Sequence, residues 1–280
     1  MNQTLRLLIR FACLITLGFL ATGCATSPYH YGLNKSAAPQ VALPKGEPQI
    51  VRGEPNKILD AADWIWPDSL LGKLVLWNWK VDRHHISAET EAAIATYLER
   101  NNLTAVKVRL NQYDPGDEWK RLTTNTSVGI GWRYTLGAFA TLGYTLLPGR
   151  ILGGDNYNPY TNTINIYSDI PAIALHEAGH AKDSANKTYP GTYAAIYTIP
   201  LVPLWHESQA TGDVIGYLKA NNELAGEREA YHILYPAYGT YVGGSFAQFL
   251  GYPWNYAVQA GAVIPGHIIG RVKGAAVGKE

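Results

Sequence analysis

The chain has 280 residues, which suits one sizeable domain or two small ones, and 47% of them are hydrophobic, enough for a buried core. The net charge is +1, from 23 basic and 22 acidic residues, so no basic surplus favours a nucleic-acid partner. Charged residues make up only 16% of the chain, below the roughly 25% of typical soluble proteins, whereas tyrosine (19) and tryptophan (8) are abundant.

Residues 1–23 are predicted to be a secretory signal peptide. Arg6 and Arg10 precede an apolar run, Phe11 to Ala21, that is shorter than the about 20 residues of a spanning helix. The run ends in "ATGC", which resembles the bacterial lipobox. This resemblance implies that Cys24 is acylated and becomes the first residue of the mature protein.

The residue after the lipobox bears on the destination. Ala25 stands where many Gram-negative lipoproteins that stay in the inner membrane have aspartate. The resemblance therefore implies an outer-membrane lipoprotein that faces the periplasm, with the membrane as a partner through Cys24. Cys13 is lost with the signal, so no free thiol is expected for a disulfide, a metal site or nucleophilic catalysis.

The next part of the chain predicts a linker followed by a mixed domain. Residues 24–56 are rich in proline and are predicted to be a tether, followed by one domain over 57–280. Within it, "KLVLWNWKV" (73–81) predicts a strand, "SAETEAAIATYLERNN" (87–102) predicts a helix capped by Ser87, and "LTAVKVRL" (103–110) predicts a second strand. A β-α-β beginning of this kind indicates a mixed domain of helices and strands.

Three segments are unusually apolar: residues 127–148, 193–205 and 243–270. Each is predicted to be a buried core element. Membrane contact and an apolar substrate groove are the alternatives that the sequence leaves open.

The stretch "ALHEAGHAKD" carries the strongest chemical signal. A short strand is predicted over Thr161–Ser168, followed by Asp169 as N-cap and Pro171 early in a helix. On that helix His176 and His180 are four residues apart, which places both imidazoles on one face, close enough to share a metal ion.

The intervening Glu177 completes the pattern H-E-x-x-H of the zincin metallopeptidases, which the stretch resembles. The resemblance implies that His176 and His180 bind Zn²⁺ and that Glu177 acts as general base. It also implies an α+β, zincin-like fold: a small sheet whose edge strand precedes the H-E-x-x-H helix and binds an extended substrate, with a helix-rich C-terminal part.

A zinc site needs a third protein ligand, and "NNELAGEREAYHILYPA" resembles the downstream glutamate helix of gluzincins, in particular the E-x-x-A-D pattern of the HtpX and CAAX-prenyl-protease type. Residue by residue, Glu227 falls on the ligand glutamate and Ala230 on the alanine, but Tyr231 replaces the aspartate. Another register makes Glu223 the ligand, and Glu229 is a further alternative.

Neighbouring polar residues have less specific predictions. Asp183 either orients a ligand histidine or lies at a solvated helix end. His232 and Tyr231 are candidates to stabilise an oxyanion, and the pair His84–His85 is predicted to lie in a turn. His206 lacks a second histidine at ligand spacing and is predicted to be structural.

Together these features predict a lipid-anchored zinc metalloendopeptidase that cleaves peptide bonds of bacterial envelope proteins. Residues 184–222, between the two predicted ligand helices, are long and apolar and could act as a lid. The alternative is a non-catalytic, zinc-stabilised lipoprotein that acts as a chaperone or assembly factor. A hydrolase acting on lipids or lipidated peptides is a third possibility. FtsH-type proteases also contain "HEAGH", but this chain has no nucleotide-binding G-x-x-x-x-G-K-[ST] loop.

Overall fold

The computed structural model describes residues 28–34, 37–54, 56–147, 154–247 and 254–279. They belong to two compact units, which are treated separately below. The N-terminal unit comprises His30–Thr198, and the C-terminal unit comprises Ile199–Glu280 together with the chain up to Tyr29. The predicted signal peptide and Cys24 lie outside the described residues.

A four-stranded mixed sheet organises the N-terminal unit, in the order β1-β2-β4-β3. The parallel part consists of β1 (Ile50–Arg52), β2 (Lys107–Leu110) and β4 (Thr163–Ile166). The edge strand β3 (Asn156–Asn158) runs antiparallel to β4. The fold is therefore mixed α/β, as predicted in outline, and the strand prediction over 103–110 is confirmed for its last four residues.

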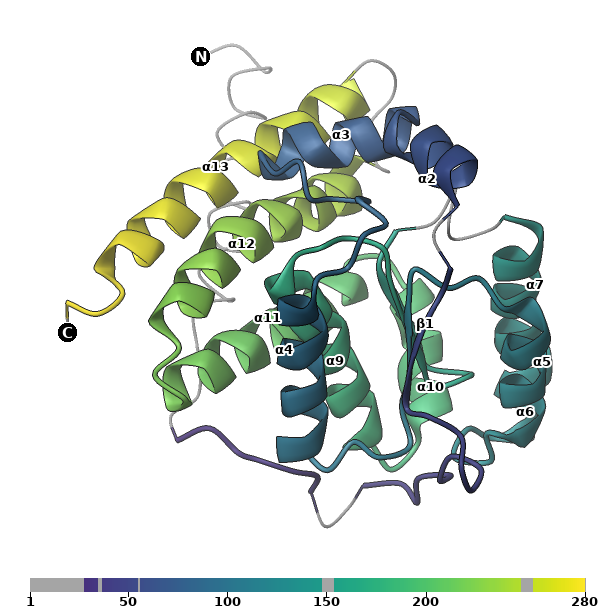
Figure 1. Cartoon of the computed structure of the whole chain (residues 1–280). Coiled ribbons are helices and arrows are strands. Elements are labelled where there is room, and N and C mark those ends of the chain that lie inside the picture. The colour runs from purple at the N-terminus through teal and green to yellow at the C-terminus, as the bar shows by residue number, and fades with distance from the viewer. Residues whose placement is uncertain (1–27, 35–36, 55, 148–153, 248–253, 280) are drawn as a thin grey trace. The chain divides into compact units, whose positions relative to one another are not determined.

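Helices cover both faces of this sheet (Figure 1). On one side, α4 (Ala88–Arg100) packs against α9 (Pro171–Ala185); on the other lie α5 (Pro115–Thr124), α6 (Ile130–Trp132) and α7 (Ala138–Leu146). The remaining helical elements of the unit are α2 (Lys57–Trp64), α3 (Pro67–Leu76), the π-helical turn η1 (Arg133–Gly137), α10 (Pro190–Ala195) and the 3-10 turn η2 (Ile196–Thr198).

Both central strands are buried throughout, because helices cover both of their faces. Val108 and Ile164 are register partners and are fully buried. Arg109, next to Val108, points to the opposite face, where its guanidinium binds Glu118 and Asp117 of α5. The alternation of apolar and charged residues in β2 therefore gives one apolar face and one charged face, and both faces are buried.

The helix predicted over 87–102 is confirmed as α4, with Ser87 as its N-cap. The strand predicted over 73–81 is wrong. Its first residues continue α3, which begins at Pro67, and Trp77 ends that helix in the left-handed conformation with a φ of 50°. The signal for a helix, Pro67 at its first position, lies six residues before the apolar run. The run by itself is too short to distinguish a strand from the end of a helix.

Asp169 does not cap the H-E-x-x-H helix. The N-cap of α9 is Ile170, without a side-chain hydrogen bond. The Asp169 carboxylate instead accepts hydrogen bonds from the Ser87 N–H (2.9 Å), the Ser87 hydroxyl (2.6 Å) and the Thr90 hydroxyl (2.8 Å). Asp169 therefore joins the start of α4 to the start of α9 and supports the packing of these two helices.

Folded structure begins before residue 57. Strand β1 lies within the range predicted as a tether and pairs with β2. Further upstream, the His30 carbonyl accepts a hydrogen bond from Lys182 Nζ of α9 (2.7 Å), and the Ala38 N–H donates to the Lys187 carbonyl (3.2 Å). Much of the proline-rich stretch is thus bound along the N-terminal unit.

The apolar segments are less buried than predicted. In residues 127–148, Ile130, Phe139 and Leu146 are 68%, 77% and 68% exposed. Part of segment 243–270 lies outside the described residues. Among the helices that the structure describes, none combines the length and the hydropathy needed to cross a bilayer.

A buried polar cluster lies beneath α2 and α3. His84, in a turn as predicted, places Nε2 2.6 Å from Asp63 and Nδ1 2.7 Å from Asn111. Burial alone would lower the pKa of His84, but these hydrogen bonds outweigh it and raise the pKa. Burial of the Asp82 carboxyl, with Asp155 nearby, raises its pKa to about 7.

We expect the free energy of unfolding to fall as pH rises from about 5 to 8, because the folded chain holds more protons than the unfolded chain in this interval. The Asp82 contribution is complete below the unfolded pKa of about 3.9 and is lost as pH rises through about 7. The His84 contribution is complete below about 6.5 and is lost as pH rises through its raised folded pKa. Urea titrations over this range measure the slope. Asp82→Asn and His84→Gln should flatten it, whereas the exposed control His85→Gln should not. A stability that increases over this range would contradict the assignment.

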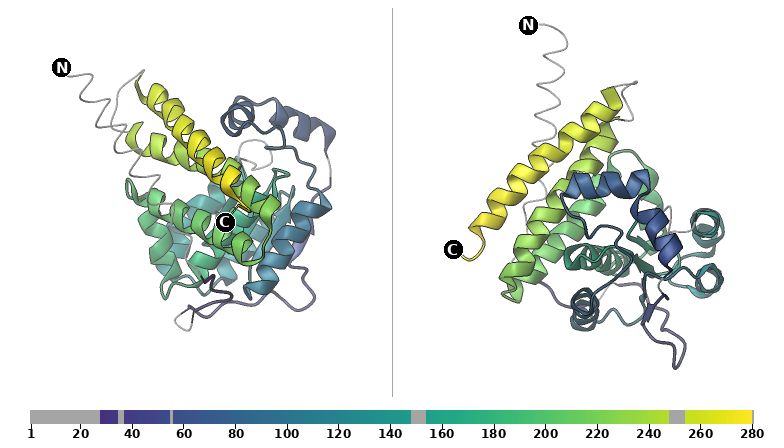
Figure 2. Two further views of the ribbon diagram at one scale, coloured as in Figure 1. Left: turned by 90° about the vertical axis from the view of Figure 1, so that its left-hand side faces the viewer. Right: turned by 45° about the horizontal axis from the view of Figure 1, so that its top comes forward.

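The C-terminal unit consists of α11 (Val202–Ala220), α12 (Leu224–Ala247) and α13 (Trp254–Ala276). Helices α12 and α13 lie side by side in both views of Figure 2 and run antiparallel. Glycine makes this approach possible: a Cβ on Gly239 would lie 2.6 Å from the Ala262 carbonyl oxygen, and one on Gly270 would lie 2.3 Å from that of Tyr231.

Candidate metal centre

Helix α9 positions the two histidines. Pro171 opens the helix, and His176 and His180 follow one turn apart on the same face. Their Nε2 atoms lie 3.1 Å apart, and the two rings are nearly perpendicular, with centroids 4.6 Å apart. Both imidazoles therefore present the same nitrogen to one point in space, which is the arrangement that a shared ion requires.

The predicted general base lies on the same helix. Glu177 is buried at 8% exposure, and His176 is similarly buried at 9%. Two small residues, Ala178 and Gly179, follow and are also buried. Carboxylates are rarely buried unless they are paired or hydrogen-bonded, so the burial of Glu177 indicates that it has a partner in the folded chain.

The strand before α9 is not the sheet edge that was predicted. β4 has neighbours on both sides, β2 and β3, so its backbone groups are already paired. The edge on this side is β3, only three residues long. Its Tyr157 hydroxyl donates to Asn162 Oδ1 at 3.0 Å, and burial raises the pKa of Tyr157 to about 12. A strand added on this side of the sheet would therefore pair with β3.

Asp183 has partners at the end of α9. It accepts a hydrogen bond from the Tyr193 hydroxyl, and its other oxygen lies 2.7 Å from Lys187 Nζ. These contacts favour the helix-end interpretation of Asp183 over a role in orienting a histidine.

The predicted third ligands lie in the C-terminal unit. Glu227 is buried at 5% exposure, with its carboxylate 3.6 Å from Lys219 Nζ. Glu223 precedes α12 and is exposed, and Glu229 is half-buried. The assignment of Glu227 as a ligand stays a prediction.

A second buried carboxylate of this unit is not part of any predicted motif. Glu207 of α11 is 2% exposed and lies in line with Ala210, Val214 and Leu218 on the buried side of that helix. An acidic residue at helical spacing from apolar residues such as Ala210 and Val214 is the signal that could have identified it.

Other candidates have local partners. The Nε2 of His232 packs against α13, where a Cβ on Gly274 would lie 2.6 Å from it, and burial together with Arg271 lowers the pKa of His232. The Tyr231 ring packs on Tyr235 at 5.5 Å. His206 is buried beside Trp205, in line with a structural role. An oxyanion role for His232 stays a prediction.

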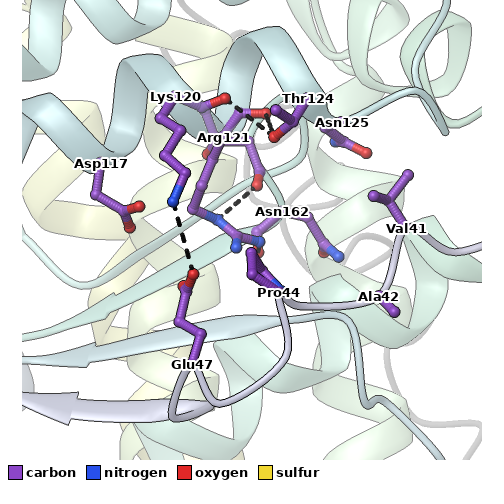
Figure 3. Close-up of a pocket in the computed structure, with 11 residues that line it drawn as sticks. Val41, Ala42, Pro44, Glu47, Asp117, Lys120, Arg121, Thr124, Asn125 and Asn162 are labelled. Atoms are coloured by element: carbon purple, nitrogen blue, oxygen red, sulfur yellow. Dashed lines mark hydrogen bonds and ion pairs between the residues drawn. The ribbon is translucent and has the colours of Figure 1, made fainter.

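A pocket of about 200 Å³ lies elsewhere in the N-terminal unit (Figure 3). Its charged groups are already engaged: Glu47 lies 3.9 Å from Lys120 Nζ, and the Arg121 guanidinium donates to the Asn162 carbonyl at 2.9 Å. None of the predicted site residues lines this pocket, so it does not support the predicted metal site.

The chain was compared with protein-family models, curated proteins and solved structures. None of these comparisons finds a match to it. The inference of function therefore depends on the geometry of α9 and on the sequence patterns described above.

Proposed function

We propose that the protein is a zinc metalloendopeptidase of the bacterial cell envelope, anchored to the outer membrane through Cys24. The observation that carries this proposal is the pair His176 and His180 on α9, with Nε2 atoms 3.1 Å apart and the buried Glu177 between them in sequence.

The spacing of the histidines fits zinc. Two nitrogens bound at about 2.0–2.1 Å in a tetrahedral site lie roughly 3.3–3.4 Å apart. The 3.1 Å between His176 Nε2 and His180 Nε2 needs only a small side-chain adjustment to reach that separation. Imidazole nitrogen is also among the ligands that zinc prefers.

The third ligand is proposed to be a carboxylate of the C-terminal unit, with Glu207 as the first candidate. Glu207 is buried at 2% exposure, and carboxylate oxygen is among the ligands that zinc binds in proteins. Glu227, buried at 5% exposure and 3.6 Å from Lys219 Nζ, is the second candidate, and the exposed Glu223 is the third.

The chemistry follows from these residues. When bound, zinc acts as a Lewis acid and makes water a nucleophile near neutral pH. Glu177 accepts the proton that the attacking water loses and returns it to the leaving amine. An extended peptide would pair its backbone with β3, the edge strand next to β4 among the described residues, so main-chain contacts rather than one side-chain pocket would hold the substrate. The substrate class is thus an unfolded or extended segment of an envelope protein.

The proposal can be tested by zinc-dependent cleavage. The full lipidated chain in detergent is incubated with fluorescently labelled unfolded casein, with and without a zinc chelator. We expect cleavage that the chelator stops and added zinc restores. Cleavage that persists in the chelator would contradict the proposal. A folded, zinc-loaded protein that cleaves nothing would favour the zinc-stabilised chaperone or assembly factor, for which a buried Glu177 has no evident use.

A further inference from the structure

The pocket in Figure 3 is enclosed by α5, the segment before β1 and the turn before β4, all within the N-terminal unit. Its volume of about 200 Å³ suits a ligand of about eight or nine non-hydrogen atoms, since a cavity of about 150 Å³ can hold benzene. Val41, Ala42 and Pro44 form the apolar part of the wall, and the rest is polar or charged. The pocket therefore offers a small molecule both an apolar and a charged surface.

Arg121 brings a positive charge to this pocket without a carboxylate in contact. Its Nε donates to the Thr161 carbonyl and the Thr163 hydroxyl, both at 3.0 Å. Its Nη2 donates to the carbonyls of Asn162 (2.9 Å) and Ala105 (3.3 Å). All of these acceptors are neutral. Among the described residues none accepts a hydrogen bond from Nη1, and this nitrogen is not sealed from solvent, so it is available to an acceptor from outside the chain.

A comparison with Arg109 shows what Arg121 lacks. Burial alone would lower the pKa of Arg109, but the carboxylates of Glu118 and Asp117, which contact its guanidinium, raise it. Burial likewise lowers the pKa of Arg121, and the same two carboxylates, which make no ion pair with it, do not offset the effect. A further negative charge beside Arg121 would therefore stabilise its charged form.

The carboxylates of the pocket wall already have cations of their own. Glu47 lies 2.9 Å from Lys107 Nζ, and Asp117 lies 2.6 Å from the Arg109 guanidinium, which also binds Glu118. The pocket and its ion pairs thus combine these three carboxylates with four cations, Lys107, Arg109, Lys120 and Arg121. The excess of one positive charge favours a ligand with a single negative charge over a phosphate, which carries about two.

We propose that this pocket binds a small molecule with one carboxylate and a short aliphatic chain. The carboxylate accepts hydrogen bonds from Arg121 Nη1, and the Lys120 ammonium group supplies the second positive charge of the wall. The aliphatic chain lies against the apolar part of the wall. A free aliphatic acid and the C-terminal residue of a peptide share this chemistry. The proposal does not depend on zinc or on peptidase activity, so it can hold or fail independently of them.

Ligand-observed NMR on the full chain measures this binding. Butyrate is the probe, and butyramide, which has the same shape but no charge, is the matched control. We expect saturable binding of butyrate with a Kd on the order of 1 mM, and roughly tenfold weaker binding of butyramide, because a charged acceptor forms the stronger hydrogen bond. N-acetylalanine separates the two sources: a Kd below that of butyrate indicates a peptide C-terminus, and a higher Kd indicates a free acid.

Two variants locate the bound carboxylate. Arg121→Gln should abolish butyrate binding, although it also removes hydrogen bonds that support the fold. Lys120→Glu leaves those bonds intact, because the Lys120 side chain is 59% exposed, and should weaken binding by a factor of about 10 or more by reversing the excess charge. Lys57→Glu, the same change at an exposed residue outside the pocket, should leave the Kd unchanged.

Equal affinities for butyrate and butyramide, or no saturation when butyrate greatly exceeds the expected Kd, would overturn the proposal. A folded Lys120→Glu protein with the Kd of the wild type would also overturn it, because binding would then lie elsewhere. Displacement of butyrate by an equal concentration of chloride would replace it with a site for simple anions that does not select a carboxylate.

Discussion

Replacing Glu177 with glutamine is expected to lower the rate of peptide hydrolysis by a factor of about 10²–10⁴, because general-base catalysis contributes this much when the base is in place. Glutamine keeps the size of the side chain and can donate or accept hydrogen bonds, but it cannot take a proton from water. Zinc content and thermal stability should stay close to those of the wild type. Steady-state cleavage of a labelled peptide, measured together with bound zinc, checks both expectations.

The matched control is Asp183→Asn, the same carboxyl-to-amide change on the same helix. Asp183 binds Lys187 and Tyr193, so its loss should affect the end of α9 and leave the rate within a few-fold of the wild type. A Glu177→Gln protein with unchanged turnover would exclude the proposed base. Equal losses in both variants would indicate a structural effect on α9.

The largest effect on stability is expected at Arg109. Its guanidinium is fully buried on β2 and binds Glu118, which is also fully buried, together with Asp117 at 2.6 Å. Burial alone would lower the pKa of Arg109, but these carboxylates outweigh it and raise the pKa. Arg109→Met leaves Glu118 charged in the core without its partner, at a cost of about 3–5 kcal/mol.

Urea unfolding followed by circular dichroism measures this cost. The control is Arg52→Met, since the ion pair of Arg52 with Glu91 has both side chains about 40% exposed and should contribute only about 0–1 kcal/mol. A double change, Arg109→Met with Glu118→Leu, should recover part of the loss because it removes the unpaired charge as well. A cost for Arg109→Met as small as that of the control would contradict the buried network.

Local signals in the sequence were sufficient for the elements that position the histidines. The Ser87 cap marks the start of α4, Pro171 marks the start of α9, and the alternation up to Leu110 marks β2. Each signal lies next to the element it starts or within it. The spacing of His176 and His180 likewise needs only helical geometry, which explains why their side-by-side arrangement could be predicted.

Contacts between distant segments explain what the sequence did not reveal. β1 is a strand because β2 pairs with it: Ile50 and Val51 favour a strand, but three residues are too few for the sequence alone to predict one. Asp169 resembles an N-cap in sequence, but the hydroxyls of Ser87 and Thr90 bind it. The apolar run after Lys73 resembles a core strand in sequence. It belongs instead to a helix that exposes apolar residues such as Leu74, whereas pattern-based prediction assumes that apolar residues are buried.

The third ligand is the most difficult assignment for the same reason. Buried carboxylates at core positions of two helices, Glu207 and Glu227, satisfy the same local pattern. A family motif favours Glu227, which lies 3.6 Å from Lys219 Nζ, whereas Glu207 is the more deeply buried of the two. Only metal binding can separate them.

The most direct test of the central claim is the zinc content of the purified full chain, measured by elemental analysis. We predict about one zinc per chain for the wild type and for Glu177→Gln, and loss of zinc in His176→Ala and in one of Glu207→Gln and Glu227→Gln. A folded wild-type protein that takes up no zinc when supplied with it, or a His176→Ala variant that keeps its zinc, would contradict the account.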